Sequence, residues 1–342
     1  MSVFKNELKN ITPEEMSLMR RFFRGYDYRG AGYTFIMNYI WRNSFCVSWE
    51  IVEGYMCLAG ARCSIYDEEG WAFMAMPLIM NKEDAAEFSE TYRTEYEPES
   101  LRNAILKCRE KFEEAGKEFL FTSIPGHMLD ILTEAFPDGI EFEHGRDYDE
   151  YVYLKEKLIT LSGRALHKKK NHLNYFLRNF EYESKPIREV DPKEVLALAA
   201  EIRDYKAQDE DEVDDIESEY EAIEEMLDIL FTPVDDEGNL RPCGQGSDEC
   251  PIYGVGIYIN GKLEAFAIGE IISDNYAAEH FEKANDNFRG LYQLVCSEFC
   301  KSLPESVVFV NREEDMGLPG LRQAKEALKP EYMEERFSAL IK

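Results

Sequence analysis

The sequence predicts an α+β (mixed α/β) protein with two mixed sheets flanked by helices, on three observations. The chain has 342 residues, a length that suggests two domains at roughly 100–200 residues each. Hydrophobic residues make up 44% of the chain, enough to bury two cores. Short β-like runs alternate with amphipathic helical stretches in the same order in both halves, which indicates a structural duplication. We therefore expect two domains, over residues 1–160 and 161–342.

The first half is predicted to contain a helix, three strands, a helix, a strand, a helix and two strands. Thr12 is a suitable N-cap for a helix that begins at Pro13, and Glu15 completes a capping box. Three β-like runs follow, over residues 44–52, 54–60 and 70–78. Apolar spacing predicts a helix from about Pro98 to Gly116. The half closes with a strand, a helix and two strands, over residues 118–123, 126–136, 140–145 and 148–154.

The second half repeats this order with different residues. Three strands form a meander over residues 250–260, 262–272 and 275–284. Its first turn is Asn260-Gly261, the strongest short-range signal for a hairpin. A helix from near Arg289, a strand, a helix and a final strand complete the half, the last three over residues 306–311, 317–328 and 331–341.

Two helical segments between these strand groups carry opposite charge. The net charge of −29 argues against broad electrostatic capture of nucleic acid or of an anionic membrane. An acidic helix is predicted over 209–230, and 12 of the 20 residues in 209–228 are acidic. Its apolar spacing favours the solvated face of a packed helix over a cation-binding surface. A basic helix is predicted over 163–180, and residues 162–180 contain no acid. The basic helix either binds an anionic partner or pairs with the acidic one.

The third strand of the second half carries candidate catalytic residues. Alternation places His280 and Glu282 on one face, together with Tyr276. Both polar groups need partners if they are buried, and together they could act as a general-base pair. At the end of the strand, Arg289 and Gly290 open a helix whose backbone N–H groups could receive an anion.

A second polar cluster follows the strand at residues 306–311. Asn311 is followed by Arg312, Glu313 and Asp315, before Gly317 and Pro319 turn the chain into a helix. Loops at the carboxyl ends of strands are frequent ligand sites in mixed sheets. The alternative is a salt-bridged turn.

Three segments together resemble one family: "LSGRALHKKKNHLNYFLRNF" (161–180), "HFEKANDNFRGLYQLV" (280–295) and "NREEDMGLPGLRQAK" (311–325). They are similar to the C-terminal domain family of phosphatidylglycerol lysyltransferases, and the resemblance runs from about Tyr33 to Pro330. It implies a tandem GNAT-like acyltransferase fold. Characterised membrane members of the family move an aminoacyl group from aminoacyl-tRNA to the headgroup of phosphatidylglycerol.

On this resemblance we expect a soluble acyltransferase that acts on a small or peptide-like acceptor, with aminoacyl-tRNA or acyl-CoA as donor. Glu282 with His280 would supply the base, and Asn311 would face the oxyanion. The remaining candidates are carrier-binding residues (Arg289, Gly290, Arg322, Lys325), contacts to a tRNA 3′ end (Lys168, Lys169, Lys170) and substrate contacts (Tyr276, Arg312, Glu313, Asp315). The alternative is a catalytically degenerate tandem GNAT protein that binds a ligand or a protein.

Compartment and metal content can also be anticipated. The eight cysteines are scattered, and no export signal or apolar run near the ~20 residues of a spanning helix occurs, so we expect a cytoplasmic protein without an integral membrane segment. Cys243 and Cys250 are separated by six residues with no His nearby, so we expect no metal there.

Overall fold

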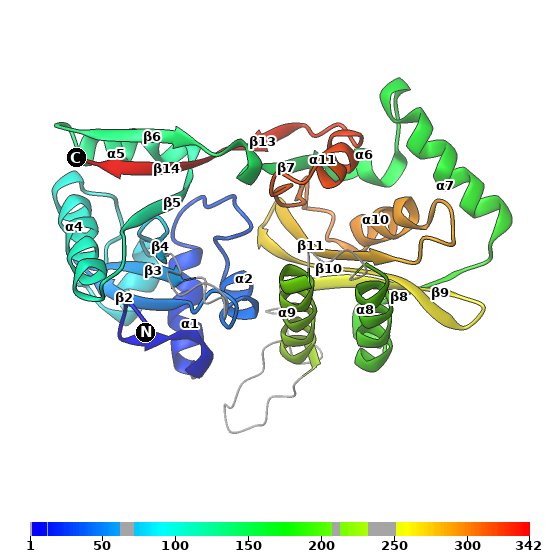
Figure 1. Ribbon diagram of the computed structural model, residues 1–342, viewed down its shortest axis with the longest axis horizontal. Coiled ribbons are helices and arrows are strands. Elements are labelled where there is room, and N and C mark those ends of the chain that lie inside the picture. Colours follow the sequence, from blue (N-terminus) through cyan, green and yellow to red (C-terminus); the bar gives the residue numbers. More distant parts are fainter. Residues whose placement is uncertain (1, 12, 62–71, 207–212, 232–250) are drawn as a thin grey trace. The chain divides into compact units, whose positions relative to one another are not determined.

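The computed structural model describes residues 2–11, 13–61, 72–206, 213–231 and 251–342 (Figure 1). Two compact units are formed, unit 1 by Met1–Asp149 with Glu334–Lys342 and unit 2 by Glu150–Met333. Each unit contains a seven-stranded mixed sheet flanked by helices, which confirms the predicted fold class. The 234–251 segment with Cys243 lies almost entirely outside the described residues.

Unit 1 has the strand order β1-β2-β3-β4-β5-β14-β6. Its strands are β1 (Asn6–Glu7), β2 (Ser48–Val52), β3 (Tyr55–Ala61), β4 (Ala72–Met74), β5 (Leu120–Pro125), β6 (Ile140–His144) and β14 (Arg336–Ile341). Its helices are α1 (Pro13–Phe23), α2 (Phe35–Ile40), α3 (Lys82–Phe88), α4 (Pro98–Glu114) and α5 (Leu129–Ala135). The predicted apolar stripe of α4, with Leu101, Ile105, Cys108 and Phe112, is buried. The parallel pair is β4 with β5.

Unit 2 has the corresponding order β8-β9-β10-β11-β12-β7-β13, and its parallel pair is β11 with β12. Its strands are β7 (Glu150–Leu154), β8 (Glu183–Pro186), β9 (Ile252–Ile259), β10 (Lys262–Ser273), β11 (Tyr276–Ala284), β12 (Phe309–Asn311) and β13 (Tyr332–Glu334). Its helices are α6 (Lys155–Thr160), α7 (His167–Asn179), α8 (Pro192–Lys206), α9 (Val213–Phe231), α10 (Leu291–Ser302) and α11 (Pro319–Glu326). The shared strand order confirms the duplication that the sequence suggests.

The strand in the sixth position of each sheet comes from the other half of the chain than the sequence predicts. The predicted closing strand of the first half, at 148–154, becomes β7 and lies in unit 2 between β12 and β13. The predicted final strand, at 331–341, divides into β13 in unit 2 and β14 in unit 1. The first boundary between the units in the sequence therefore lies between Asp149 and Glu150, whereas the sequence analysis predicts it at residue 160. β7 is almost fully buried and β14 is only partly buried, and the local pattern of either strand does not specify which sheet receives it.

The helices of unit 2 cover both faces of its sheet (Figure 1). α10 packs on one face with α6 and α7, and its buried side chains join Tyr151 and Tyr153 of β7 in one core. α8 and α9 pack together on the other face. The predicted Asn260-Gly261 hairpin is confirmed, because both residues have the positive φ that a type I′ turn requires, 52° and 80°.

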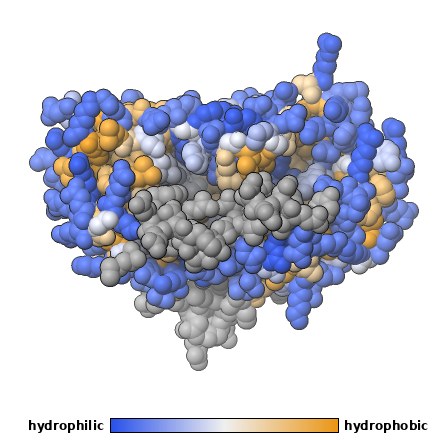
Figure 2. All heavy atoms as spheres, viewed as in Figure 1, coloured by the Kyte–Doolittle hydropathy of each residue, from blue (hydrophilic) through white to orange (hydrophobic). Residues whose placement is uncertain are grey.

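The polarity of the surface agrees with the composition. Most of the described side chains on the face shown in Figure 2 are hydrophilic, with smaller hydrophobic patches between them. α9 buries Ile223, Leu227 and Leu230, while Glu217, Glu221, Glu224 and Asp228 are exposed, as expected of a packed helix with a solvated face; residues 209–212 are outside the described part of the chain. Among the described helices, none has both the length and the apolar character needed to cross a membrane.

Candidate active site

The candidate site lies where the parallel strands of unit 2 separate. β11 and β12 pair over three positions, ending with Ala278 opposite Asn311. Beyond this point β11 continues along β10 to Ala284, whereas the chain after β12 turns into the loop that leads to α11. Polar residues that follow Ala278 and Asn311 therefore meet at the opening of the sheet, which is a common place for ligand sites in mixed sheets.

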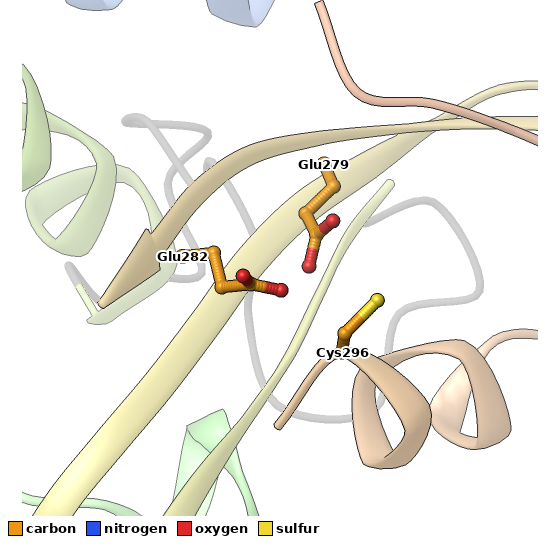
Figure 3. Close-up of side chains that lie close together, drawn as sticks. All are labelled: Glu279, Glu282 and Cys296. Atoms are coloured by element: carbon orange, nitrogen blue, oxygen red, sulfur yellow. The ribbon is translucent and has the colours of Figure 1, made fainter. Parts of the chain in front are cut away.

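A β-bulge in β11 decides which of these residues share a face. Phe281 lies opposite Ile268 of β10 and Glu279 lies opposite Gly269, so His280 is an extra residue between them. In a regular strand Glu279 and Glu282 would point to opposite faces. The extra residue brings their side chains to the same face, the one that α10 covers (Figure 3).

Glu279 and Glu282 form a buried cluster with Arg312 and Cys296. Oxygen atoms of the two carboxylates and Sγ of Cys296 lie within 4.8 Å of one another. Nη2 of Arg312 lies 2.8 Å from Oε2 of Glu282, and Nε of Arg312 is in contact with Glu279. The Glu279 side chain is 1% exposed and that of Glu282 is 14% exposed, so a substrate can reach Glu282 more easily.

The environment changes the proton affinity of these groups. Burial raises the pKa of Glu279 to about 8, and the neighbouring Glu282 carboxyl adds to the rise against the opposing charge of Arg312. Burial alone would lower the pKa of Arg312, but the two carboxylates hold it well above its usual value. The site therefore keeps a fixed cation beside a carboxyl group that titrates near neutral pH, an arrangement suited to proton transfer.

The thiol and two carboxylates form a set that could in principle hold a metal ion. Arg312 already supplies positive charge to both carboxylates. In addition, contact with Cys300 and burial raise the pKa of the Cys296 thiol well above its usual value, so it resists becoming a thiolate ligand. The donor set is a poor fit to a metal, and we assign none.

His280 differs from the sequence prediction, which paired it with Glu282. Because of the bulge its ring is on another side of the strand, 1% exposed, with Nδ1 2.7 Å from Glu313 and Nε2 3.1 Å from Glu270. A ring held between two carboxylates donates from both nitrogens and has no free nitrogen to accept a proton. His280 is therefore not available as a base, and Glu279 is the companion of Glu282.

Several residues predicted to contact substrate or carrier instead hold the loop after β12. Asp315 accepts two hydrogen bonds from Arg322, from Nε at 2.8 Å and from Nη2 at 2.7 Å, and one from Tyr151 at 2.6 Å. Lys325 donates to the carbonyls of Arg312, at 2.6 Å, and of Glu314. Arg322 and Lys325, two of the four residues predicted to bind a carrier, are therefore engaged within the fold.

Asn311 and Tyr276 are also used within the fold. Asn311 is fully buried; its amide donates to Glu150, and its Oδ1 accepts from the Glu313 N–H at 2.8 Å. It does not face the cluster as an oxyanion donor would. Tyr276 is buried, and its hydroxyl lies 3.5 Å from that of Tyr332. Of the four predicted substrate contacts, Arg312 is the one that joins the cluster.

The basic helix lies beside the cluster. α7 contacts α10, and burial next to Arg312 lowers the pKa of Lys169, which is half-buried. Lys168 and Lys170 are exposed. Burial and the nearby cations, Arg289 foremost, lower the pKa of His172. Among the described residues, no carboxylate pairs with the cations of this segment, which are Arg164, Lys168, Lys169, Lys170 and Arg178. The acidic helix α9 pairs instead with Arg203 and Lys283.

The beginning of α10 joins this basic surface. Gly290 has φ 96°, and a Cβ there would lie 2.2 Å from the carbonyl oxygen of His172, so glycine permits the close approach of α7. The exposed Arg289 lies over the ring of Tyr175, 5.0 Å from its centre. We call Lys168, Lys169, Lys170, His172 and Arg289 the basic surface.

Glu279 and Cys296 were missed by the sequence analysis. Strict alternation predicts that Glu279 lies on the face opposite Glu282, and the bulge overturns this prediction. One signal was present: Gly269, directly opposite, where a Cβ would lie 1.9 Å from the carbonyl oxygen of Ala278. A glycine inside a strand pattern often marks a bulge.

Comparison with known proteins agrees with this architecture. The family model described as phosphatidylglycerol lysyltransferase, C-terminal, matches residues 94–340. This chain belongs to that family. An uncharacterized protein of Mycoplasmoides gallisepticum is 26% identical over 230 residues, which cover 61% of this chain and 66%, just under two thirds, of the relative.

Solved structures show the same fold for this lysyltransferase C-terminal family member. A protein of unknown function from Bacteroides thetaiotaomicron has 24% identity and a TM-score of 0.76, with 97% of this chain and 98% of that chain covered. L-PGS from Bacillus licheniformis has 12% identity and a TM-score of 0.56, with 99% and 93% covered. Together with the family model, these structures agree with the fold that the sequence resemblance implies.

Proposed function

We propose that this chain is an aminoacyltransferase that moves the aminoacyl group of an aminoacyl-tRNA to a small or peptide-like acceptor, at the opening of the unit 2 sheet. The observation that carries the proposal is the cluster of Glu279, Glu282 and Arg312 at that opening. Acyl transfer requires a proton acceptor for the nucleophile and a positive group for the developing oxyanion. The cluster contains both kinds of group.

In the proposed reaction Glu282 is the base and Arg312 stabilises the oxyanion. The amine or hydroxyl of the acceptor transfers its proton to Glu282 as it forms a bond to the carbonyl carbon of the ester. Negative charge on the carbonyl oxygen is met by the Arg312 guanidinium. The ester C–O bond then breaks, and the proton passes to the departing ribose oxygen. Glu279 supports Glu282 by keeping one proton within the carboxyl pair.

The basic surface is the proposed contact for the tRNA end. Polyanions bind to clusters of Lys and Arg, and in a chain of net charge −29 such a cluster must be local. α7 contacts α10, and Lys169 lies near Arg312, so a tRNA end whose phosphates bind Lys168 and Lys170 would bring its ester toward the cluster. The family name, phosphatidylglycerol lysyltransferase, is consistent with transfer of an aminoacyl group.

Transfer of label tests the proposal. Wild-type protein is incubated with [14C]aminoacyl-tRNA and a bacterial metabolite extract, and label is followed from tRNA into small products. We expect transfer by the wild type and a loss of about 10²–10⁴-fold in Glu282→Gln. Glu298→Gln is the matched control, because Glu298 on α10 is also shielded but pairs with Lys301.

Other outcomes reject specific parts of the proposal. Transfer from [14C]acetyl-CoA instead of tRNA overturns the donor, and label in phosphatidylglycerol vesicles overturns the acceptor. Absence of transfer from either donor overturns the enzyme assignment in favour of a binding module. Equal rates for the wild type and Glu282→Gln remove Glu282 from the role of base.

A further inference from the structure

We propose that His280 is a positioning residue, whose ring, clamped between Glu270 and Glu313, fixes the bulge and the loop that bring Glu279, Glu282 and Arg312 together. The inference rests on the cluster described under the proposed function, but it concerns how that cluster is assembled. His280 does not touch the reacting atoms in this scheme. It acts through the backbone of β11 and through the residue that follows Arg312.

The bulge places the carboxylates of Glu279 and Glu282 on one face. His280 is the residue without a partner position on β10, between the Ile268–Phe281 and Gly269–Glu279 pairs. Closing the bulge would move either Glu279 or Glu282 to the opposite face. The position of the extra residue therefore determines whether the cluster exists.

The His280 ring connects three strands at the bulge. Glu270 belongs to β10, His280 to β11, and Glu313 follows β12. The ring is 1% exposed, and the carboxylates are 4% and 19% exposed, so the contacts are shielded from water. Carboxylates accept hydrogen bonds, so both ring nitrogens donate and the ring is an imidazolium. Burial would lower the pKa of His280, but the two carboxylates outweigh it and raise the pKa to about 10.

The clamp also fixes the direction of Arg312. Glu313 has φ 58°, in the left-handed region that glutamate rarely adopts. Its N–H is held by Asn311 at 2.8 Å, and its carboxylate is held by His280 at 2.7 Å. With Glu313 fixed on the side of His280, the preceding residue, Arg312, points to the other side, where Glu279 and Glu282 lie.

The pKa of Glu279 reports the geometry of the cluster without requiring any activity. Glu279 is faced by Glu282 on its own strand, Arg312 after β12, Cys296 on α10 and Tyr153 on β7. Its titration is followed by NMR of protein labelled at the glutamate carboxyl carbons, and Glu279→Gln identifies the signal. If transfer activity is absent, this measurement still decides the role of His280, so the two proposals fail separately.

In His280→Gln we expect the pKa of Glu279 to fall by about two units, because the carboxyl leaves its buried position when the bulge relaxes. Glu298→Gln should leave it unchanged. A folded His280→Gln protein with the wild-type pKa at Glu279 overturns the proposal. If His280→Gln does not fold, Glu313→Ala replaces it, because this variant removes the acceptor for His280 Nδ1 and keeps the contact of His280 with Glu270; an unchanged pKa of Glu279 there overturns the proposal in the same way.

Discussion

The two units share one sheet and differ in chemistry at the same point of it. Phe121 of β5 pairs with Met74 of β4, as Asn311 pairs with Ala278 in unit 2. Two residues after Phe121 and Asn311, each unit has a residue in the left-handed region, Ser123 at φ 56° and Glu313 at φ 58°. The backbone of the opening is therefore conserved between the two units.

The side chains at this point are unrelated. The residue before the left-handed one is Thr122 in unit 1 and Arg312 in unit 2. The five residues after the parallel pairing are Ala75, Met76, Pro77, Leu78 and Ile79 in unit 1, and Glu279, His280, Phe281, Glu282 and Lys283 in unit 2. Unit 1 has no carboxylate in these five positions, so the proposed chemistry belongs to unit 2.

Tyrosines fill the opening in unit 1. The hydroxyl of Tyr33 accepts from the N–H of Met76 at 3.3 Å and donates to the carbonyl of Ser123 at 2.7 Å. Tyr28 accepts from the N–H of Ile79 at 3.0 Å. These hydroxyls satisfy backbone groups that the separation of the strands leaves unpaired. The comparison shows that the parallel strands of each sheet separate at this point. The side chains then either fill the opening, as in unit 1, or place charged groups there, as in unit 2.

Removal of β14 should have the largest effect, and it should destabilise the sheet of unit 1 but not that of unit 2. β14 lies between β5 and β6, so a chain ending at Met333 leaves both without that partner. We expect hydrogen exchange to show loss of protection in β5 and β6, while β9, β10 and β11 keep theirs. A chain ending at Ile341 is the control. Loss of protection in β9–β11 with β5 intact would contradict the observed exchange of strands.

Arg312→Gln should be the most costly single substitution at the opening. It leaves Glu279 and Glu282 buried without their cation, which we expect to lower the free energy of unfolding by about 3–5 kcal/mol. Thr122→Val, at the corresponding place in unit 1, should cost about 1 kcal/mol, because it removes one hydroxyl contact, with Ser338. Urea denaturation measures both. Equal costs would show that the charges of unit 2 are not mutually dependent.

Local sequence patterns were sufficient for most of the fold. The apolar stripe of α4 and the Asn260-Gly261 turn each depend on a few neighbouring residues, and the structure contains both. The exchange of β7 and β14 could not be predicted, because the local pattern of a strand does not specify which sheet it completes. Their destination depends on contacts between residues far apart in the chain.

The candidate site was predicted by region but not by role. Glu282, Lys169 and Arg289 were selected because polar residues at the end of a strand and cations without nearby acids are visible in the sequence. The exchange of roles between His280 and Glu279 follows from one extra residue, and a strict alternation does not reveal it. Arg322 was predicted to bind a carrier because the sequence does not reveal its hydrogen bond to Asp315, which depends on the fold of the loop after β12.

The pH dependence of stability should reveal the buried carboxyl group of Glu279 in unit 2, which has no counterpart at the corresponding position of unit 1. Between about pH 4.5 and 8 the folded chain keeps a proton on Glu279 that the unfolded chain has lost, so this group makes the unfolding free energy fall as pH rises. Glu279→Gln should remove a slope of up to about 1.4 kcal/mol per pH unit in that window. Urea denaturation at several pH values tests this. Parallel curves for the two proteins would mean that Glu279 titrates normally.

Tyr28→Phe should have the smallest effect, and it tests whether the opening of unit 1 is purely structural. Burial raises the pKa of Tyr28, so its hydroxyl stays protonated and bonded to Ile79 and, at 2.8 Å, to Tyr96. Loss of the hydroxyl should cost about 1–2 kcal/mol in unfolding free energy, because the buried Ile79 N–H then loses this acceptor. Transfer by the folded variant should equal that of the wild type. A reduced rate at unchanged stability would mean that unit 1 takes part in the reaction, and that its tyrosines do more than fill the opening.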